Sequence, residues 1–282
     1  MERFDSTEAK RGYLEGDFAF FHLKDMQNVQ FEYHYHDFSK IVVFISGNVT
    51  YLVEGKAYRL KPWDILFING SEVHKAVIDP YVFYERIIIW VNHGFLEKHS
   101  DNCKLMTCFD INTEKNSNLL RPDHIFQNGL EYMLAKLEEA CRNDGFGSAI
   151  LKNAILLQLF VELTRERLKI GVLNGNSDII IDSSIQKLLD YINTNISGDL
   201  SIETLAARFY TSRYHLMHKF KQQTGYSVHN YIQQKRLIKA DSLIRSGVTA
   251  AQASEQCGFN DYSSFARAYG KMFGSTPRNR VR

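Results

Sequence analysis

The sequence has few cysteines and prolines and lacks a long hydrophobic run. Its four cysteines, Cys103, Cys108, Cys141 and Cys257, are scattered and form no CxxC pair, which argues against structural disulfides and favours a reducing compartment. There is no run of about 18 apolar residues, so no membrane span is expected. The N-terminus, MERFDSTEAK, is polar and acidic, unlike a signal peptide. These absences predict a cytoplasmic protein without a membrane partner.

Charge is distributed unevenly along the chain of 282 residues. Residues 183–282 contain 14 Lys and Arg residues against 6 Asp and Glu residues, a net charge of +8, whereas the remainder has 20 against 26, a net charge of −6. A basic domain beside an acidic one suggests a polyanion as partner of the former. An ordinary solvated surface carries such charge equally well. The sequence pattern must therefore decide between a polyanion-binding domain and a merely solvated one.

Hydrophobic periodicity divides the chain into segments. Residues 16–92 contain short β-branched and aromatic runs between turn signals such as Glu54-Gly55 and Asn69-Gly70, a pattern typical of a sandwich or small barrel. Residues 130–142 and 148–169 have the length of helices and contain no Gly or Pro. We therefore expect a β-barrel in residues 1–120, a helical segment in 121–170, a linker in 171–183 and an all-α domain in 184–282.

The last hundred residues contain a repeat. Leu200–Gly225 and Val248–Gly274 each read as a short helix, a tight turn and a longer helix. Ala206 and Ser254 supply the small residue that two closely crossing helices need. Each longer helix also has an i,i+4 apolar pair that pins it to its own core. This arrangement predicts two helix-turn-helix units, although a helical bundle with a polar face would show a similar pattern.

The opposite face of each longer helix is free to enter a major groove. Arg267 is the best candidate for reading bases, because a guanidinium can bond both guanine acceptors. Lys221 and Lys271 are expected to contact phosphate. The full set of predicted DNA-binding residues is Arg213, Tyr214, Met217, His218, Lys221, Tyr262, Ser263, Arg267 and Lys271.

A long helix, residues 227–246, connects the two units. Arg236 falls on its apolar inner face, so we expect this side chain to bridge the units through a buried ion pair or backbone carbonyls.

Segment 185–280 resembles the AraC/XylS-type DNA-binding domain over its full length. The matching residues are LAARFYTSRYHLMHKFKQQTG, the RLIKADSLI helix and GFNDYSSFARAYGKMFGSTP. The resemblance implies seven helices, two of which enter successive major grooves of double-stranded promoter DNA. Ala253-Ser254 and Gly270 depart from the usual Ile-Ala and Lys of that family.

Residues 15–95 resemble the cupin motifs, through HYHDFSKIVVFISG and GKAYRLKPWDILFINGSEVHK. His34, His36 and His74 match three metal ligands of metal-binding cupins, but Lys40 stands where those proteins have a Glu, and Trp63 replaces a Gly. Iron or manganese favours a carboxylate beside the imidazoles, although three histidines could hold zinc. We therefore predict no metal and no cofactor.

The resemblance implies a sensor domain that binds a sugar or a related small molecule without metal. The candidate effector-binding residues are His34, His36, Lys40, His74 and Trp90. Residues 123–142 and 148–169 resemble the dimerisation segment of these regulators, which implies a homodimer, and RNA polymerase is a further candidate partner.

The sequence thus predicts an effector-responsive transcription regulator that is not an enzyme. Two alternatives stay open: a constitutive DNA-binding protein whose barrel only dimerises, and a metal-dependent cupin enzyme fused to a DNA-binding domain.

Overall fold

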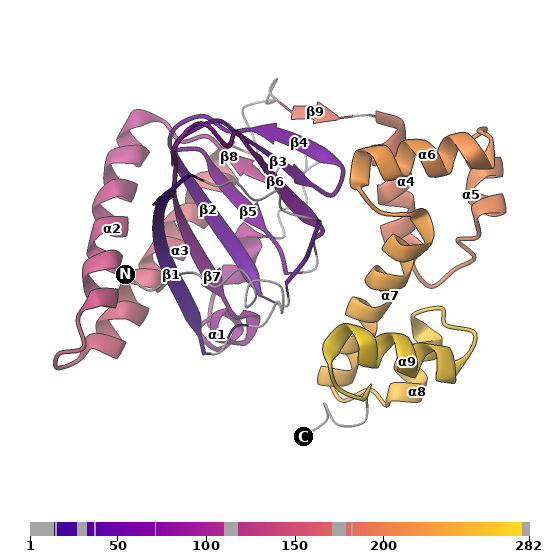
Figure 1. Ribbon diagram of the computed structural model, residues 1–282. Coiled ribbons are helices and arrows are strands. Elements are labelled where there is room, and N and C mark those ends of the chain that lie inside the picture. The colour runs from indigo at the N-terminus through magenta and orange to yellow at the C-terminus, as the bar shows by residue number, and fades with distance from the viewer. Residues whose placement is uncertain are drawn as a thin grey trace. The chain divides into compact units, whose positions relative to one another are not determined.

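A computed structural model describes residues 14, 16–26, 33–36, 38–70, 72–109, 118–170, 179–181 and 183–277. The chain divides into two compact units, Met1–Ile180 and Ile181–Arg282. In Figure 1 the colour changes from indigo at the N-terminus to yellow at the C-terminus. The finer boundaries at residues 120, 170 and 183 stay predictions.

The first unit contains two sheets. The larger has the order β1 (Phe18–Asp25), β7 (Tyr84–Val91), β2 (Ser39–Ser46), β5 (Ile65–Ile68), β8 (Leu119–Leu120). The smaller has the order β6 (His74–Ile78), β3 (Val49–Val53), β4 (Lys56–Arg59), β9 (Ile179–Ile181). The expected β-rich sensor fold is confirmed. The described strands nevertheless form two open sheets instead of one closed barrel, because the sheets pack through side chains and are not joined by a continuous hydrogen-bond ladder.

Strand β9 lies within the segment that the sequence indicated as linker. Residues 171–178 and 182 of that segment lie outside the described residues. Ile179–Ile181 is a short β-branched run of the kind that strands favour, and three residues are too few to reveal a period.

Tight turns follow the predicted signals. Glu54 and Gly55 form a two-residue connection between β3 and β4, with φ values of 46° and 76°, as expected of a hairpin whose central residues both have positive φ. Trp63 has a φ of 70°, which explains why the matching position in cupins is a Gly.

Strand β2 is buried on both faces. Ile41 and Val43 belong to a core shared with the helices, whereas Val42 and Phe44 belong to the core between the two sheets. The helices of the first core are α1 (His93–Lys98), η1 (Leu105–Cys108), α2 (His124–Arg142) and α3 (Ser148–Ile170). Figure 1 shows α2 and α3 beside the larger sheet. The helix expected at residues 148–169 is therefore α3, which packs on the larger sheet.

The second unit is helical. Its helices are α4 (Ser183–Thr194), α5 (Ile202–Arg208), α6 (Arg213–Thr224), α7 (Val228–Arg245), α8 (Ala250–Gln256) and α9 (Tyr262–Phe273). Residues 183–277 thus hold six helices, one fewer than the family resemblance implies. The two predicted helix-turn-helix units are confirmed as α5–α6 and α8–α9.

The longer helix of each unit is capped at both ends. Ser212 accepts a hydrogen bond from the backbone N–H of His215 at the start of α6, and Asp261 accepts two at the start of α9. Gly225 and Gly274 end these helices with φ values of 77° and 68°.

Arg236 connects the two helix-turn-helix units, as predicted. Its guanidinium donates to the carbonyl oxygens of Ile196 (2.9 Å), Gly198 (2.7 Å) and Gly258 (2.7 Å). The first two carbonyls precede α5, and the third lies in the turn of the second unit. One side chain of α7 therefore fixes both units by three charge-assisted hydrogen bonds.

Gly258 lies where this contact is closest. Its φ is 80°, and a Cβ atom there would stand 2.8 Å from the carbonyl oxygen of Ser197 and 3.1 Å from Cζ of Arg236. The equivalent turn residue of the first unit, Tyr210, has a φ of 50° and is 97% exposed. The turn residue therefore has a positive φ in both units, but only in the second unit is there no room for a side chain.

We expect Gly258→Ala to lower the free energy of unfolding by about 2–5 kcal/mol, since backbone strain and the clash with a carbonyl oxygen add. Gly247→Ala is the matched control: its φ is 95°, but nothing lies within 4 Å of its Cβ position, so about 1 kcal/mol is expected. Urea denaturation measures both. Equal losses would contradict the close contact at Gly258.

Candidate effector site and nucleic-acid interface

The predicted DNA-binding residues lie exposed on two helices of the second unit. Tyr214 and Met217 of α6 are 76% and 45% exposed. The buried sides of the same helices hold Leu216, Phe220 and Phe265. All nine predicted residues are exposed, namely Arg213, Tyr214, Met217, His218, Lys221, Tyr262, Ser263, Arg267 and Lys271. Exposure leaves these side chains accessible, and their contact with DNA stays a prediction.

Two arginines of this set already have partners in the protein. Arg213 forms an exposed ion pair with Glu203 of α5, with 2.9 Å between Nη1 and Oε1, and hydrogen bonding to Arg213 lowers the pKa of Glu203. Arg267 lies along its own helix, with Nη2 3.4 Å from Oγ of Ser264. Exposed contacts of this kind are weak, so both guanidinium groups can exchange them for nucleic-acid partners.

An aromatic pair adds to the surface of α6. The rings of Tyr214 and His218 lie nearly parallel, with centroids 6.0 Å apart. Sequence reasoning did not select Tyr210, which stands exposed in the turn just before α6. Its alignment with Gly258 of the second repeat could have marked it as a turn residue.

The predicted effector-binding residues come together at one end of the two sheets. Lys40 stands at the start of β2 opposite Trp90 near the end of β7. Because side chains alternate along a strand, Lys40 shares the face of Val42 and points between the sheets. His34 bridges to His74 by a pair of backbone hydrogen bonds of 3.0 and 2.9 Å.

Three imidazoles form a tight cluster there. The ring centroids of His34 and His74 are 4.4 Å apart, and those of His36 and His74 are 5.1 Å apart. Phe38, which sequence reasoning missed, lies between two predicted residues: its ring stacks on His36 and is 4.6 Å from Trp90. The spacing His36-x-Phe38-x-Lys40 could have indicated it, since alternate strand residues share a face.

The hydrogen bonds of the cluster define which atoms remain available. Nδ1 of His74 donates to the carbonyl oxygen of Glu72 at 3.0 Å, so Nε2 of the neutral ring is an acceptor. That nitrogen and Nδ1 of His36 are buried without a hydrogen-bond partner among the described residues. Burial, followed by the Lys40 ammonium, holds the pKa of both rings well below the usual range. Both imidazoles are therefore neutral at pH 7.

Lys40 is a buried cation with an unusual environment. It is 8% exposed, and burial, aided by the charge of Arg86, lowers its pKa to about 8. Its Nζ lies over the ring of Tyr51, 5.9 Å from the ring centroid. Other buried charges of this unit are paired, Arg86 with Asp25 and Asp64 with Arg121.

The histidine cluster does not fit a cupin metal centre. Ligand atoms of His34, His36 and His74 lie within 4.8 Å of one another, as a metal would require. However, within the described part of the chain no carboxylate joins them, and the ammonium that depresses the pKa of two of these rings would repel a second cation.

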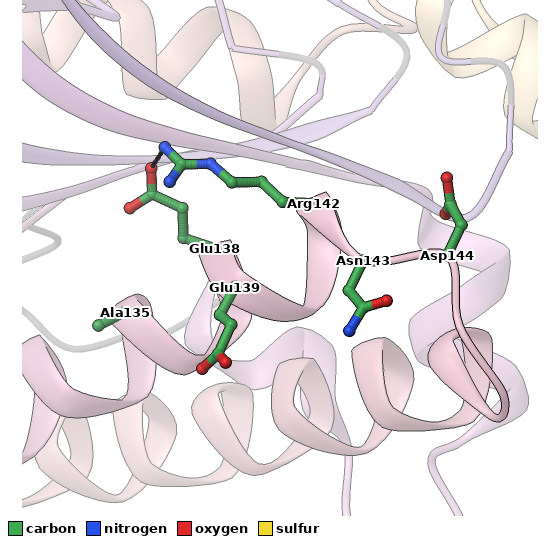
Figure 2. A pocket seen from close by; sticks show the side chains of 6 residues that line it. All are labelled: Ala135, Glu138, Glu139, Arg142, Asn143 and Asp144. Carbon is green, nitrogen blue, oxygen red and sulfur yellow. Dashed lines mark hydrogen bonds and ion pairs between the residues drawn. The ribbon is translucent and has the colours of Figure 1, made fainter.

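An open pocket of 550 Å³ lies elsewhere, at the C-terminal end of α2. Figure 2 shows Glu138 and Arg142 of this pocket paired with one another. The pocket is formed by one helix end and the following turn, so it is distinct from the histidine cluster. Of the described helices, none combines the length and the apolar character that crossing a membrane requires.

Two exposed helix-turn-helix units and a two-sheet domain with a buried polar cluster define a DNA-binding regulator with a ligand-binding domain. Residues 18–160 match the family described as AraC-like ligand binding domain, and residues 205–282 match the helix-turn-helix domain family. Since the first match covers half of the chain, the chain belongs to the AraC family. The family predicted from the sequence is thereby confirmed.

Similar curated proteins cover both units. The HTH-type transcriptional activator RhaR of Mannheimia succiniciproducens is 25% identical over 88% of this chain and 86% of its own length. The activator RhaS of Escherichia fergusonii is 25% identical over the same shares. A solved structure of a probable AraC family regulator from Rhodopseudomonas palustris is 28% identical, covers 36% of this chain and 95% of its own, and has a TM-score of 0.33.

We expect Lys40→Met to stabilise the protein at pH 7 by on the order of 2–3 kcal/mol, because it removes a buried charge. The folded pKa of about 8 lies below the usual 10.5, so the unfolded chain binds more protons between these values. The penalty is therefore complete below pH 8 and fades as the pH rises towards 10.5. Chemical denaturation at pH 7 and pH 9.5 measures it.

Lys24→Met is the control, since Lys24 is 61% exposed on β1 and should change stability little at either pH. A Lys40→Met gain that does not shrink at the higher pH would contradict the buried-charge assignment.

Proposed function

We propose that this regulator reads promoter DNA with α6 and α9 and responds to a small molecule bound between its two sheets. The observation that carries the proposal is the tandem of capped, exposed helices on a basic unit. Each helix begins at a capping side chain and ends at a left-handed glycine, so its exposed face is presented as a rigid element.

The roles within each helix follow from side-chain chemistry. Arg267 reads guanine, and Tyr214 and His218 contact bases from α6. Lys221 and Lys271 bind phosphate and position the unit without reading sequence. Arg236 contacts neither base nor phosphate in this proposal, and instead positions α6 and α9. It does so by hydrogen bonds to the segment before α5 and to the turn between α8 and α9.

The effector site uses His34, His36, Lys40, His74 and Trp90. What supports this assignment is their convergence from three parts of the chain and the buried nitrogen atoms of His36 and His74 that lack partners among the described residues. A bound molecule that satisfies these atoms would change the stability of the sheet pair. Such a ligand alters DNA affinity only if it binds two states differently.

The protein acts as a homodimer in the cytoplasm and is not an enzyme. The relatives are named transcriptional activators, and activation of transcription by contact with RNA polymerase is part of this proposal. Lys40 at the position of a cupin carboxylate argues against metal-dependent catalysis.

The dimer contact lies on the outer side of α3. Leu156, Leu159 and Phe160 are buried against the larger sheet, whereas Ile150 and Leu151 are 77% and 54% exposed. A helix that leaves large apolar side chains in solvent on one side is typical of an interaction surface.

We expect Ile150→Glu to be monomeric at concentrations where the wild-type protein is dimeric, because an isologous contact places the new charge twice in one interface. Sedimentation velocity measures the mass. Val77→Glu is the control, because Val77 is 48% exposed on β6 of the other sheet. A wild-type monomer, or an Ile150→Glu dimer, would contradict this surface.

DNA recognition is tested by fluorescence anisotropy on DNA from the upstream region of the protein's own gene. Affinity should fall at least about a hundredfold between about 50 and 200 mM salt, since Lys and Arg displace counterions from phosphates. Arg267→Ala should lose about 1–3 kcal/mol of discrimination at one base pair, whereas Lys221→Ala should weaken all sequences alike. Equal effects of Arg267→Ala on cognate and scrambled DNA would remove it as a base reader.

A further inference from the structure

The ammonium of Lys40 stands out among the buried charges of the first unit. Arg86, which is 5% exposed, bonds both oxygens of Asp25, and Asp64, which is 0% exposed, accepts from Nε and Nη2 of Arg121 at 2.8 Å each. Lys40 is also buried, at 8% exposure, yet no described residue offers it a carboxylate. A buried charge without a counter-ion destabilises the fold, and an opposite charge brought to it offsets much of that cost.

Hydrogen-bond acceptors lie beside this cation. Lys40 lies opposite Trp90 across β2 and β7, and the Trp90 ring centroid is 6.1 Å from that of His36, which is 5.1 Å from that of His74. Burial, followed by the charge of Lys40, lowers the pKa of both imidazoles. Nε2 of His74 is an unpartnered acceptor, since Nδ1 carries the proton that is donated to Glu72. Lys40 and His74 therefore offer a positive charge and a neutral hydrogen-bond acceptor within one buried cluster.

Aromatic rings border the same cluster. Phe38 is 2% exposed and lies 4.5 Å from His36 and 4.6 Å from Trp90, measured between ring centroids. Flat apolar surfaces suit the carbon skeleton of a small ligand.

We propose that the effector is a small hydroxycarboxylic acid, such as a sugar acid, whose carboxylate pairs with Lys40 and whose hydroxyl group donates to Nε2 of His74. This inference rests on the proposed effector site and specifies its ligand class. A neutral sugar would satisfy the imidazole and leave the ammonium without a counter-ion. A divalent cation would satisfy the imidazoles but meet the positive charge of Lys40.

The test compares matched acids and neutral compounds on the full-length protein. The probes are gluconate, glucuronate and lactate, each against its neutral counterpart sorbitol, glucose or glycerol, at equal ionic strength. Thermal unfolding reports binding through the shift of Tm, and calorimetry gives Kd. We expect at least one acid to raise the Tm of the wild type and of Lys24→Met, and Lys40→Met to bind that acid about tenfold to hundredfold more weakly.

Folding of the variant does not limit this test, because Lys40→Met is expected to be more stable than the wild type. Equal binding of the acid by Lys40→Met and wild type would overturn the inference, as would the absence of a Tm shift with any of the three acids.

Other outcomes separate this inference from the proposed function. If neutral compounds alone shift Tm and DNA affinity, effector binding stands and the anionic class is rejected. If zinc raises Tm and His74→Gln abolishes that effect, the cluster is a metal site and the inference is rejected. If neither acids, neutral compounds nor zinc change Tm or DNA affinity, the effector site itself fails together with this inference.

Discussion

Strand β2 is buried on both faces, and the arrangement of the first unit follows from this. One set of alternate residues, Ile41 and Val43, packs under the helices, and the other, Val42 and Phe44, faces the second sheet. The side chain of Lys40 must then point between the sheets, because residues two positions apart in a strand share a face and Val42 faces the second sheet. A charge that would be fully solvated on a surface strand is thus desolvated here, which lowers the pKa of Lys40 to about 8. In our proposal, a ligand of opposite charge offsets this cost.

The second unit depends on a comparable constraint at a single side chain. Two helix-turn-helix units can contact successive grooves only if their relative orientation is fixed, and the guanidinium of Arg236 joins three carbonyl groups from segments on both sides of α7. The contact is so close that Gly258 has no room for a Cβ atom. The same turn in the first unit tolerates Tyr210 because its side chain extends into solvent. The repeat is thus symmetric in backbone conformation and asymmetric in packing.

The two units divide the chemistry of regulation between them. The acidic first unit contains the buried polar cluster, and the basic second unit carries the exposed side chains suited to a polyanion. In our proposal, lysines have different roles in the two units. A lysine in solvent attracts phosphate without specificity, whereas a buried lysine discriminates between ligands by their charge. Membership of the AraC family accounts for both units in one chain.

The sequence by itself determined the two-part organisation, the tandem helix-turn-helix units and the bridging role of Arg236, because these depend on local periodicity and repetition. It also selected the five residues that meet between the sheets. Tertiary structure alone decided that the sheets stay open, that β9 forms within the expected linker, and that Phe38 joins the cluster. It also decided that Lys40 lies buried and that none of the described residues brings a carboxylate to it, while Arg86 and Asp64 each have an oppositely charged partner. Such pairings join residues distant in sequence, and no local pattern specifies which charge will find a partner.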